Sequence, residues 1–300
     1  MKTVLITGGT GFLGRNIIPL LLEKNYKVSN LAPGTYEDER VENIFFDAHE
    51  DDPRETLKGR DFDFVLHLAA YSTPKLATEY EKTMKLNVEF TEKLLQSAST
   101  FPSLKGFFFF STALVYSDKA ARPLREEALT ETRAGDFYSE SKIKAEAVCK
   151  HFYDQGLPLH IWRLTNCFGP YQAHFPHPNL IPQIMKEAID KKKVTILNGS
   201  YTRDFLFSKD LASLIVEALE LKDAYFLLNV ATGTPHSVSE IAEVVAKELD
   251  APIEDLKKEL PQSSDLTLNI SKLKTLFPHF KFTAFDEALR SSLAYYIHIV

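Results

Sequence analysis

The sequence contains few of the residues that build disulfides or metal sites. Only two of its 300 residues are cysteines, Cys149 and Cys167, and they do not have the spacing of metal ligands. So few thiols are typical of a reducing compartment, and we expect both to be free. His174 and His177 lie close together, but no third ligand accompanies them, so we expect a surface loop there and no metal.

Excess positive charge and long apolar runs are also lacking. The net charge is −6 at pH 7, which argues against a broad basic surface for nucleic acid. No apolar run approaches the length that crosses a membrane. A strand pattern begins at Lys2, which leaves no room for a signal peptide. We therefore expect a cytoplasmic protein that contacts neither nucleic acid nor a membrane.

Glycine is scarce, with 12 residues, yet Gly8, Gly11 and Gly14 are spaced three apart. An apolar strand pattern precedes them and a helical pattern follows. Glycine permits a tight turn, and it lets main-chain N–H groups approach a phosphate at the positive end of the next helix. This segment, including Phe12 and Leu13, therefore predicts a turn that binds the pyrophosphate of a dinucleotide.

Strand and helix patterns alternate along the first part of the chain. Strand patterns lie at 4–6, 27–31, 44–46, 64–68, 106–111 and 160–164, and helical patterns at 12–24, 84–100 and 138–153. This rhythm predicts an α/β fold with a doubly wound, Rossmann-like parallel sheet. Prolines cluster after residue 170. We expect a dinucleotide-binding domain at 1–170 and, at 171–300, mainly a smaller substrate-binding lobe, from which some elements return to the sheet.

Tyr138 and Lys142 lie four residues apart in a helical pattern, so they share one face. A second such pair, Tyr71 and Lys75, encloses Pro74, which argues against a helix there. A phenol has a pKa of roughly 10, so a tyrosine that acts as a base near neutral pH needs a neighbour that favours the phenolate. A lysine on the same face is such a neighbour.

Three motifs resemble the extended short-chain dehydrogenases/reductases, the NAD-dependent epimerase/dehydratase family that acts on nucleotide sugars. They are the glycine turn beginning at Thr7, the Tyr138–Lys142 pair, and the segment 163–170, Arg-x-x-Asn-x-x-Gly-Pro. The resemblance implies hydride exchange between a nicotinamide ring and a sugar carbon. It also implies that Tyr138 is the acid and base, that Lys142 tunes it, and that Thr112, or else Ser111, orients the sugar oxygen.

The resemblance also implies contacts for individual residues elsewhere in the sequence. It implies that the cofactor, NAD or NADP, contacts Asp47, Ala69, Ala70, Asn87 and Thr165 in addition to the glycine turn, Tyr138 and Lys142. It implies that a nucleotide-diphosphate sugar contacts Ser72, Thr112, Asn166 and Arg203. A forked arginine suits bidentate contact with a diphosphate. A homodimer is also expected.

Four positions depart from the family pattern. Ala113 and Leu114 stand where dehydratases have an Asp-Glu pair, which leaves an epimerase or a 4-ketoreductase. Ala32-Pro33-Gly34 stands where NAD enzymes carry an acidic residue, so NAD and NADP remain open, with Arg15 or Arg40 as candidate contacts for a 2′-phosphate. Ser117 replaces the glycine of a turn, and 262–265 lacks a second arginine for the diphosphate.

Two other functions remain open at this point. A reductase of non-nucleotide carbonyl compounds would use the same acid and base but would not need Arg203. A catalytically silent nucleotide sensor could share the fold, because fold does not determine function. The presence of Thr112, Tyr138 and Lys142 together favours an enzyme.

Overall fold

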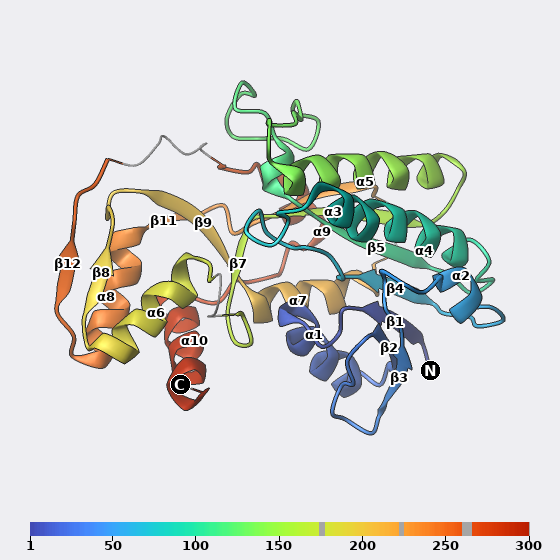
Figure 1. The fold of residues 1–300 in the computed structure, drawn as a ribbon, viewed down its shortest axis with the longest axis horizontal. Helices are drawn as coiled ribbons and strands as arrows, with labels where there is room; N and C mark the ends of the chain where they lie inside the picture. The colour runs from blue at the N-terminus through green and yellow to red at the C-terminus, as the bar shows by residue number, and fades with distance from the viewer. Residues whose placement is uncertain (174–177, 222–224, 260–265, 300) are drawn as a thin grey trace.

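The computed structural model describes residues 1–173, 178–221, 225–259 and 266–299 (Figure 1). Its largest feature is a seven-stranded, entirely parallel sheet with the order β10-β6-β5-β4-β1-β2-β3. The strands are β1 (Thr3–Thr7), β2 (Lys27–Ala32), β3 (Val41–Phe45), β4 (Phe64–His67), β5 (Gly106–Thr112), β6 (Leu159–Leu164) and β10 (Leu227–Val230). The predicted Rossmann-like α/β fold is confirmed.

Helices cover both faces of this sheet. On one face, α1 (Phe12–Glu23) lies beside α7 (Ser208–Ala218), and on the other lie α4 (Phe90–Ala98) and α5 (Phe137–Asp154), with the short α2 (Pro53–Thr56) beside α4 (Figure 1). Strand β5 is buried along its whole length. Its alternate side chains enter two different hydrophobic clusters, Phe108 and Phe110 on one side and Phe107 and Phe109 on the other. The apolar run is therefore explained by burial on both faces.

The second part of the molecule is built around its own hydrophobic cluster (Figure 1). It contains the sheet β11-β9-β7 and the pair β12-β8. The elements are β7 (Asn166–Phe168), β8 (Val194–Ile196), β9 (Thr202–Phe207), β11 (Pro235–Ser237), β12 (Ile253–Asp255), α6 (Leu180–Lys191), α8 (Val238–Leu249) and α10 (Phe285–Ile299). Elements later in the chain than residue 170 also join the large sheet, because β10 pairs with β6, α7 packs on α1, and α9 (Ser271–Leu276) contacts β10.

The helix expected at 84–100 differs from the prediction. It begins earlier, as α3 (Tyr80–Met84), passes through a π-helical turn at Lys85–Glu89 and continues as α4. The side chain of Asn87, in the π turn, is buried and bonded to a loop. A single π turn commonly marks a functional position inside a helix.

The strand expected at 44–46 also differs, because β3 spans Val41–Phe45. As an edge strand it buries only Val41 and Ile44, and polar residues between them obscure the pattern. Among the described residues, no helix is both long and apolar enough to cross a membrane.

Candidate active site

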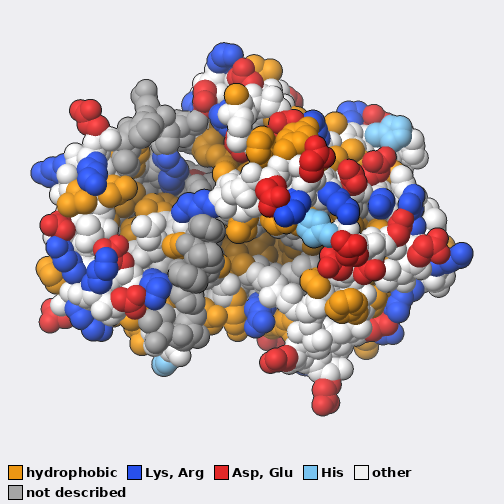
Figure 2. Space-filling view, viewed as in Figure 1, with side chains coloured by type: hydrophobic (Ala, Val, Ile, Leu, Met, Phe, Trp, Pro, Cys, Tyr) orange, Lys and Arg blue, Asp and Glu red, His pale blue; other side chains and the backbone are white. Residues whose placement is uncertain are grey.

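A cavity of about 390 Å³ opens at the carboxyl edge of the large sheet, where the second part of the molecule meets it. Figure 2 shows the face hollowed between these two parts, with hydrophobic side chains in the hollow. Open α/β sheets bind ligands at this edge. Most of the predicted site residues line the cavity: Gly8, Gly11, Phe12, Leu13, Gly14, Ala69, Ala70, Ser72, Thr112, Tyr138, Lys142, Thr165 and Asn166.

At the three glycines of the glycine turn, only main-chain atoms face the cavity. Gly8 has a φ of +72°, and a Cβ there would lie 3.0 Å from Ala69 N. A Cβ on Gly14 would lie 2.4 Å from the Cα of Gly9. Gly11 is the N-cap of α1, and no side chain caps the first N–H groups of that helix. The turn therefore has the geometry of an anion cradle, as its sequence predicts.

The buried side-chain amide of Asn30 holds the glycine turn in place. Asn30 lies in the middle of β2, and its Oδ1 accepts a hydrogen bond of 3.1 Å from Gly9 N. Its Nδ2 donates to Gly34 O at 3.2 Å and to Asn43 Oδ1 at 3.1 Å. Sequence reasoning missed this residue, although a polar residue inside an apolar strand was the available signal. The amide frame shapes the loop after β2.

The two arginines considered for a 2′-phosphate have other contacts. Arg40 Nη2 forms an ion pair with Asp38 at 2.7 Å. Arg15 Nε donates to Thr10 O at 2.9 Å, and its guanidinium lies 5.7 Å from the centroid of the Tyr171 ring. Strand β2 ends at Ala32, which has no side-chain polar group. The end of β2 therefore presents no acidic side chain for the ribose hydroxyls and no arginine that is free of other contacts to bind a 2′-phosphate.

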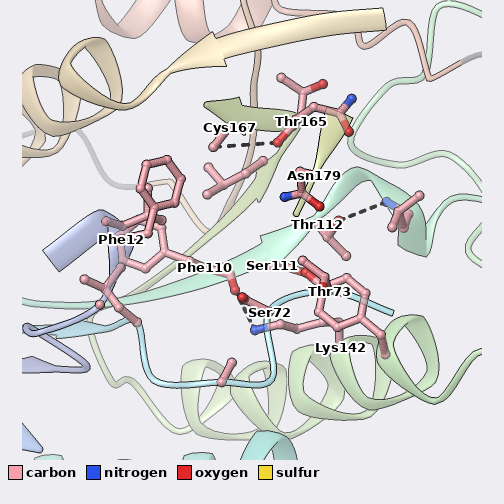
Figure 3. Close-up of a pocket in the computed structure, with 18 of the residues that line it drawn as sticks. Phe12, Ser72, Thr73, Phe110, Ser111, Thr112, Lys142, Thr165, Cys167 and Asn179 are labelled. Atoms are coloured by element: carbon pink, nitrogen blue, oxygen red, sulfur yellow. Dashed lines mark hydrogen bonds between the residues drawn. The ribbon is translucent and has the colours of Figure 1, made fainter. Parts of the chain in front are cut away.

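The three predicted catalytic residues come from the end of β5 and the start of α5; Thr112 and Lys142 are labelled in Figure 3. Tyr138, Lys142 and Thr112 are 6%, 5% and 8% exposed. The Thr112 side chain lies close enough to the Tyr138 hydroxyl to lower its pKa, and Thr112 Oγ1 accepts a hydrogen bond from Leu114 N at 3.2 Å. Lys142 Nζ donates to Phe110 O at 2.8 Å, a bond drawn in Figure 3. Asp136 caps α5 by accepting from Ser139 N at 3.0 Å, which fixes the turn that carries Tyr138.

Burial shifts the pKa of both titratable groups. It raises the pKa of the Tyr138 hydroxyl well above its ordinary value, and the hydrogen bond with Thr112 lowers it in part. Burial lowers the pKa of Lys142 to about 8. In the protein by itself, Thr112 is the side chain that lowers the pKa of Tyr138, and the tuning role of Lys142 stays a prediction. A positive charge brought into the cavity would lower the pKa of Tyr138 further.

Asn87 is not part of the cavity lining. Its Oδ1 accepts from Tyr71 N at 2.8 Å, and its Nδ2 donates to Tyr71 O at 3.1 Å and to Ser141 Oγ at 2.9 Å. These bonds tie the loop after β4 to helix α5. Asn87 therefore braces two walls of the cavity, and a direct contact with a cofactor stays a prediction.

Asp47 and Arg203 also lie outside the described lining. Asp47 Oδ1 accepts from His49 N at 2.9 Å in the loop after β3. Arg203, in β9, donates from Nη1 to Thr202 O at 2.7 Å. Their predicted contacts with adenine and diphosphate stay predictions. The segment 262–265 and the histidines at 174 and 177 lie outside the described residues, and the described residues contain no cluster of ligands for a metal.

Several cavity residues escaped sequence reasoning: Thr73, Pro74, Cys167, Gln172, Asn179 and Leu266. Thr73 Oγ1 and Gln172 Oε1 are buried without a hydrogen-bond partner in the structure. Asn179 stands at the N-cap of α6, yet its side chain makes no capping bond, and it is among the cavity side chains in Figure 3. An asparagine directly before a helical pattern is commonly a helix cap, so the sequence around Asn179 contains no signal for a cavity residue.

His67 in β4 is a structural residue. Its two ring nitrogens lie 2.7 Å from Thr7 Oγ1 and 2.9 Å from Thr91 Oγ1. Burial lowers the pKa of His67 to about 3, so the ring is neutral. Thr7 Oγ1 also accepts from Ala69 N at 3.1 Å. The histidine thus holds the end of β4 against the glycine turn.

Comparison with known proteins agrees with this geometry. The sequence model described as the NAD dependent epimerase/dehydratase family matches residues 4–231. A UDP-N-acetyl-alpha-D-glucosaminuronate decarboxylase of Bacillus cytotoxicus is 25% identical over 99% of this chain and 98% of its own length. A putative UDP-glucose 4-epimerase of Methanocaldococcus jannaschii is 27% identical over 82% of each chain. The structure of a UDP-glucose 4-epimerase of Thermotoga maritima superposes with a TM-score of 0.89 at 21% identity, covering 99% of each chain.

Proposed function

Because the chain belongs to the NAD-dependent epimerase/dehydratase family, we propose that it is a nucleotide-sugar epimerase in which Tyr138 is the acid and base. The observation that carries this proposal is the placement of two buried residues with side-chain hydroxyls, Tyr138 and Thr112, together in the wall of the cavity. Two such hydroxyls can bind one substrate oxygen, one orienting it and the other exchanging its proton.

The cavity suits NAD at one end. Backbone of the glycine turn would hold the pyrophosphate, since no side chain caps the first N–H groups of α1, and a Cβ at Gly8 or Gly14 would collide with neighbouring backbone and displace the turn. The buried oxygens of Thr73 and Gln172 are free to receive hydrogen bonds. When bound, NAD accepts and returns a hydride and brings a positive ring. That ring would lower the pKa of Tyr138, which burial by itself raises.

The protein's own residues then perform proton transfer at one sugar carbon. Tyr138, as the phenolate, takes the proton of a sugar hydroxyl while the carbon loses its hydride, and it returns the proton when the ketone is reduced. Thr112 orients the same oxygen. Ala113 and Leu114 also line the cavity and cannot act as acids or bases. The described lining thus supports oxidation and reduction at one carbon better than elimination of water.

The polar lining favours an epimerase over a 4-ketoreductase. Apart from Lys142, the polar side chains of the described cavity lining are neutral, among them Ser72, Thr73, Asn166, Gln172 and Asn179. Hydroxyls and amides both donate and accept hydrogen bonds, so they can hold a keto sugar in two orientations. Epimerisation requires both orientations, whereas a ketoreductase needs one.

The test is an assay of the purified protein with UDP-glucose and related nucleotide sugars, together with mass spectrometry of any ligand that co-purifies. An epimerase interconverts two sugars without net consumption of added cofactor. A 4-ketoreductase instead consumes one reduced cofactor for each 4-keto sugar. Turnover of simple carbonyl compounds but not of nucleotide sugars would favour the non-nucleotide reductase, and no turnover of either would favour the nucleotide sensor.

Arg203→Ala tests the predicted diphosphate contact. Removal of one partner of a desolvated charge pair commonly costs about 2 to 5 kcal/mol, so nucleotide-sugar binding should weaken far more than NAD binding. Calorimetry with a nucleoside diphosphate measures this loss. Arg290→Ala is the matched control, because Arg290 pairs with Glu248 and Asp286 in exposed positions. Unchanged binding in the Arg203 variant would contradict the contact.

A further inference from the structure

A charged pair is buried between α5 and β6, behind the wall of the cavity. Arg163 Nη2 donates to Glu146 Oε2 at 2.6 Å, and Arg163 Nε donates to Glu146 Oε1 at 3.0 Å. The two side chains are 6% and 11% exposed. Such a pair adds little net stability, because loss of hydration offsets the attraction. The other contacts of Glu146 and Arg163 therefore have to explain why the pair lies in the core.

Those contacts lead to the catalytic residues. Ser111 Oγ donates to Glu146 Oε1, and Ser111 directly precedes Thr112 on β5. Glu146 lies one helical turn after Lys142 on α5, and Lys142 Nζ donates to the carbonyl of Phe110, the residue before Ser111. One carboxylate thus joins the strand that carries Thr112 to the helix that carries Tyr138 and Lys142.

The arginine is held from its far side. Arg163 Nη1 donates to Glu126 O at 3.0 Å, and its guanidinium lies 4.7 Å from the centroid of the Tyr116 ring. Tyr116 Oη donates to Asn229 Oδ1 at 2.6 Å, and Asn229 N donates to Glu126 Oε1 at 3.0 Å. Because each side chain is fixed by a neighbour, the charges of the pair occupy constant positions relative to the cavity.

We propose that the Glu146–Arg163 pair is a positioning device that aligns Ser111 and Thr112 with α5 and balances the electrostatic field at Tyr138 and Lys142. This proposal rests on the proposed role of Tyr138 as acid and base. The groups that influence Lys142 are Glu146 and Cys149 on its own helix and His67 on β4. His67 is neutral and the Cys149 thiol is protonated, because burial raises its pKa. Tyr138 is also influenced by Asp136, which caps α5, and by Cys167, whose buried thiol is protonated. Asp136 and the Glu146–Arg163 pair are therefore the permanent charges around the two residues.

The pair predicts opposite effects for its two members. Glu146→Gln leaves Arg163 uncompensated, and the uncompensated positive charge lowers the pKa values of Lys142 and Tyr138, so the pH profile of turnover moves to lower pH. Arg163→Met leaves Glu146 uncompensated and moves the profile to higher pH. Each shift should be about half a pH unit or more in this low-dielectric setting. A purely structural pair would alter stability in both variants without opposite displacement.

Two controls make the result decisive. Asp154→Asn removes the exposed ion pair of Lys150 on the same helix and should leave the pH profile unchanged. The double variant Glu146→Gln/Arg163→Met removes both charges, so its profile should lie close to that of the wild type. The double variant also remains informative if a single variant fails to fold. A displaced profile in the double variant, or single variants that shift together or not at all, would overturn the proposal.

A readout without turnover separates this inference from the proposed function. The phenolate of Tyr138 absorbs in the near ultraviolet, and its titration is measured with NAD bound, because burial by itself places the pKa of Tyr138 well above its ordinary value. The titration is the difference between each variant and the same variant carrying Tyr138→Phe. Glu146→Gln should lower this titration midpoint and Arg163→Met should raise it. If Tyr138→Phe retained turnover, the proposed function would fail. Titration midpoints displaced in opposite directions by the two variants would still show that the charges of the Glu146–Arg163 pair act on Tyr138. Identical midpoints would reject the inference alone.

Discussion

The carboxyl ends of β5 and β2 lie on the same edge of one sheet but are built from different chemistry. At the end of β5, Thr112 adjoins Tyr138, and a buried ion pair lies directly behind them. At the end of β2, the support is a pair of neutral amides, Asn30 and Asn43, and the strand stops at an alanine. The end of β5 is supported by a buried ion pair, and the end of β2 by hydrogen bonds between neutral amides.

The difference matches the roles that we propose for the two ends, proton transfer at β5 and ribose binding at β2. Proton transfer requires a tyrosine whose pKa can be moved, so burial and fixed charges around it are useful. A ribose subsite only requires shape and hydrogen bonds, and a charge there serves mainly to discriminate between cofactors. The end of β5 should therefore be intolerant of substitution, whereas the end of β2 should accept it with small effects.

The largest effect is expected at the end of β5. Tyr138→Phe removes the transferable proton and little volume, so turnover should fall by about 10²- to 10⁴-fold while NAD affinity stays the same. Steady-state kinetics and cofactor titration measure the two quantities. Tyr71→Phe is the matched control, because Tyr71 belongs to the other Tyr–Lys pair of the sequence and lies outside the described cavity lining. Near-normal turnover of the Tyr138 variant would end the assignment of the acid and base.

The fold and the catalytic end were largely predictable, because both depend on local patterns. The apolar run of β5, the three glycines and the i, i+4 spacing of Tyr138 and Lys142 each report a geometric requirement within a few residues.

The supporting contacts were not predictable in the same way, since they join distant segments. Asn30 acts on a turn 21 residues away, and Arg163 reaches Glu146, 17 residues earlier. Asn179 approaches the cavity only because α6 begins beside it, and its sequence context is that of an ordinary helix cap. Tertiary packing decides these roles, and no single segment contains the signal.

A second, smaller effect compares two glycines of the cofactor side. Gly14→Ala would bring a Cβ within 2.4 Å of Gly9 backbone, so the turn must shift, whereas a Cβ on Gly34 would meet Thr10 at an ordinary 3.6 Å. NAD binding should weaken on the order of a hundredfold, about 2.7 kcal/mol, for Gly14→Ala. Gly34→Ala should change it by less than about threefold, well under 1 kcal/mol. Equal losses, measured by calorimetry, would mean that the end of β2 is as tightly constrained as the turn.

The smallest effect concerns the choice between NAD and NADP. Because β2 ends in Ala32, no carboxylate accepts the ribose hydroxyls or repels a 2′-phosphate, and Arg40 is already paired with Asp38. The protein should therefore discriminate poorly between the two cofactors. Ala32→Asp supplies the missing carboxylate and should shift the ratio of dissociation constants toward NAD by about tenfold, ~1.4 kcal/mol. Ala32→Asn is the control, because asparagine is similar in size to aspartate but neutral, and it should shift the ratio of dissociation constants less. If the wild-type protein already preferred one cofactor by more than about a thousandfold, roughly 4 kcal/mol, residues elsewhere would have to recognise the ribose, and the contrast between the two ends of the sheet would not hold.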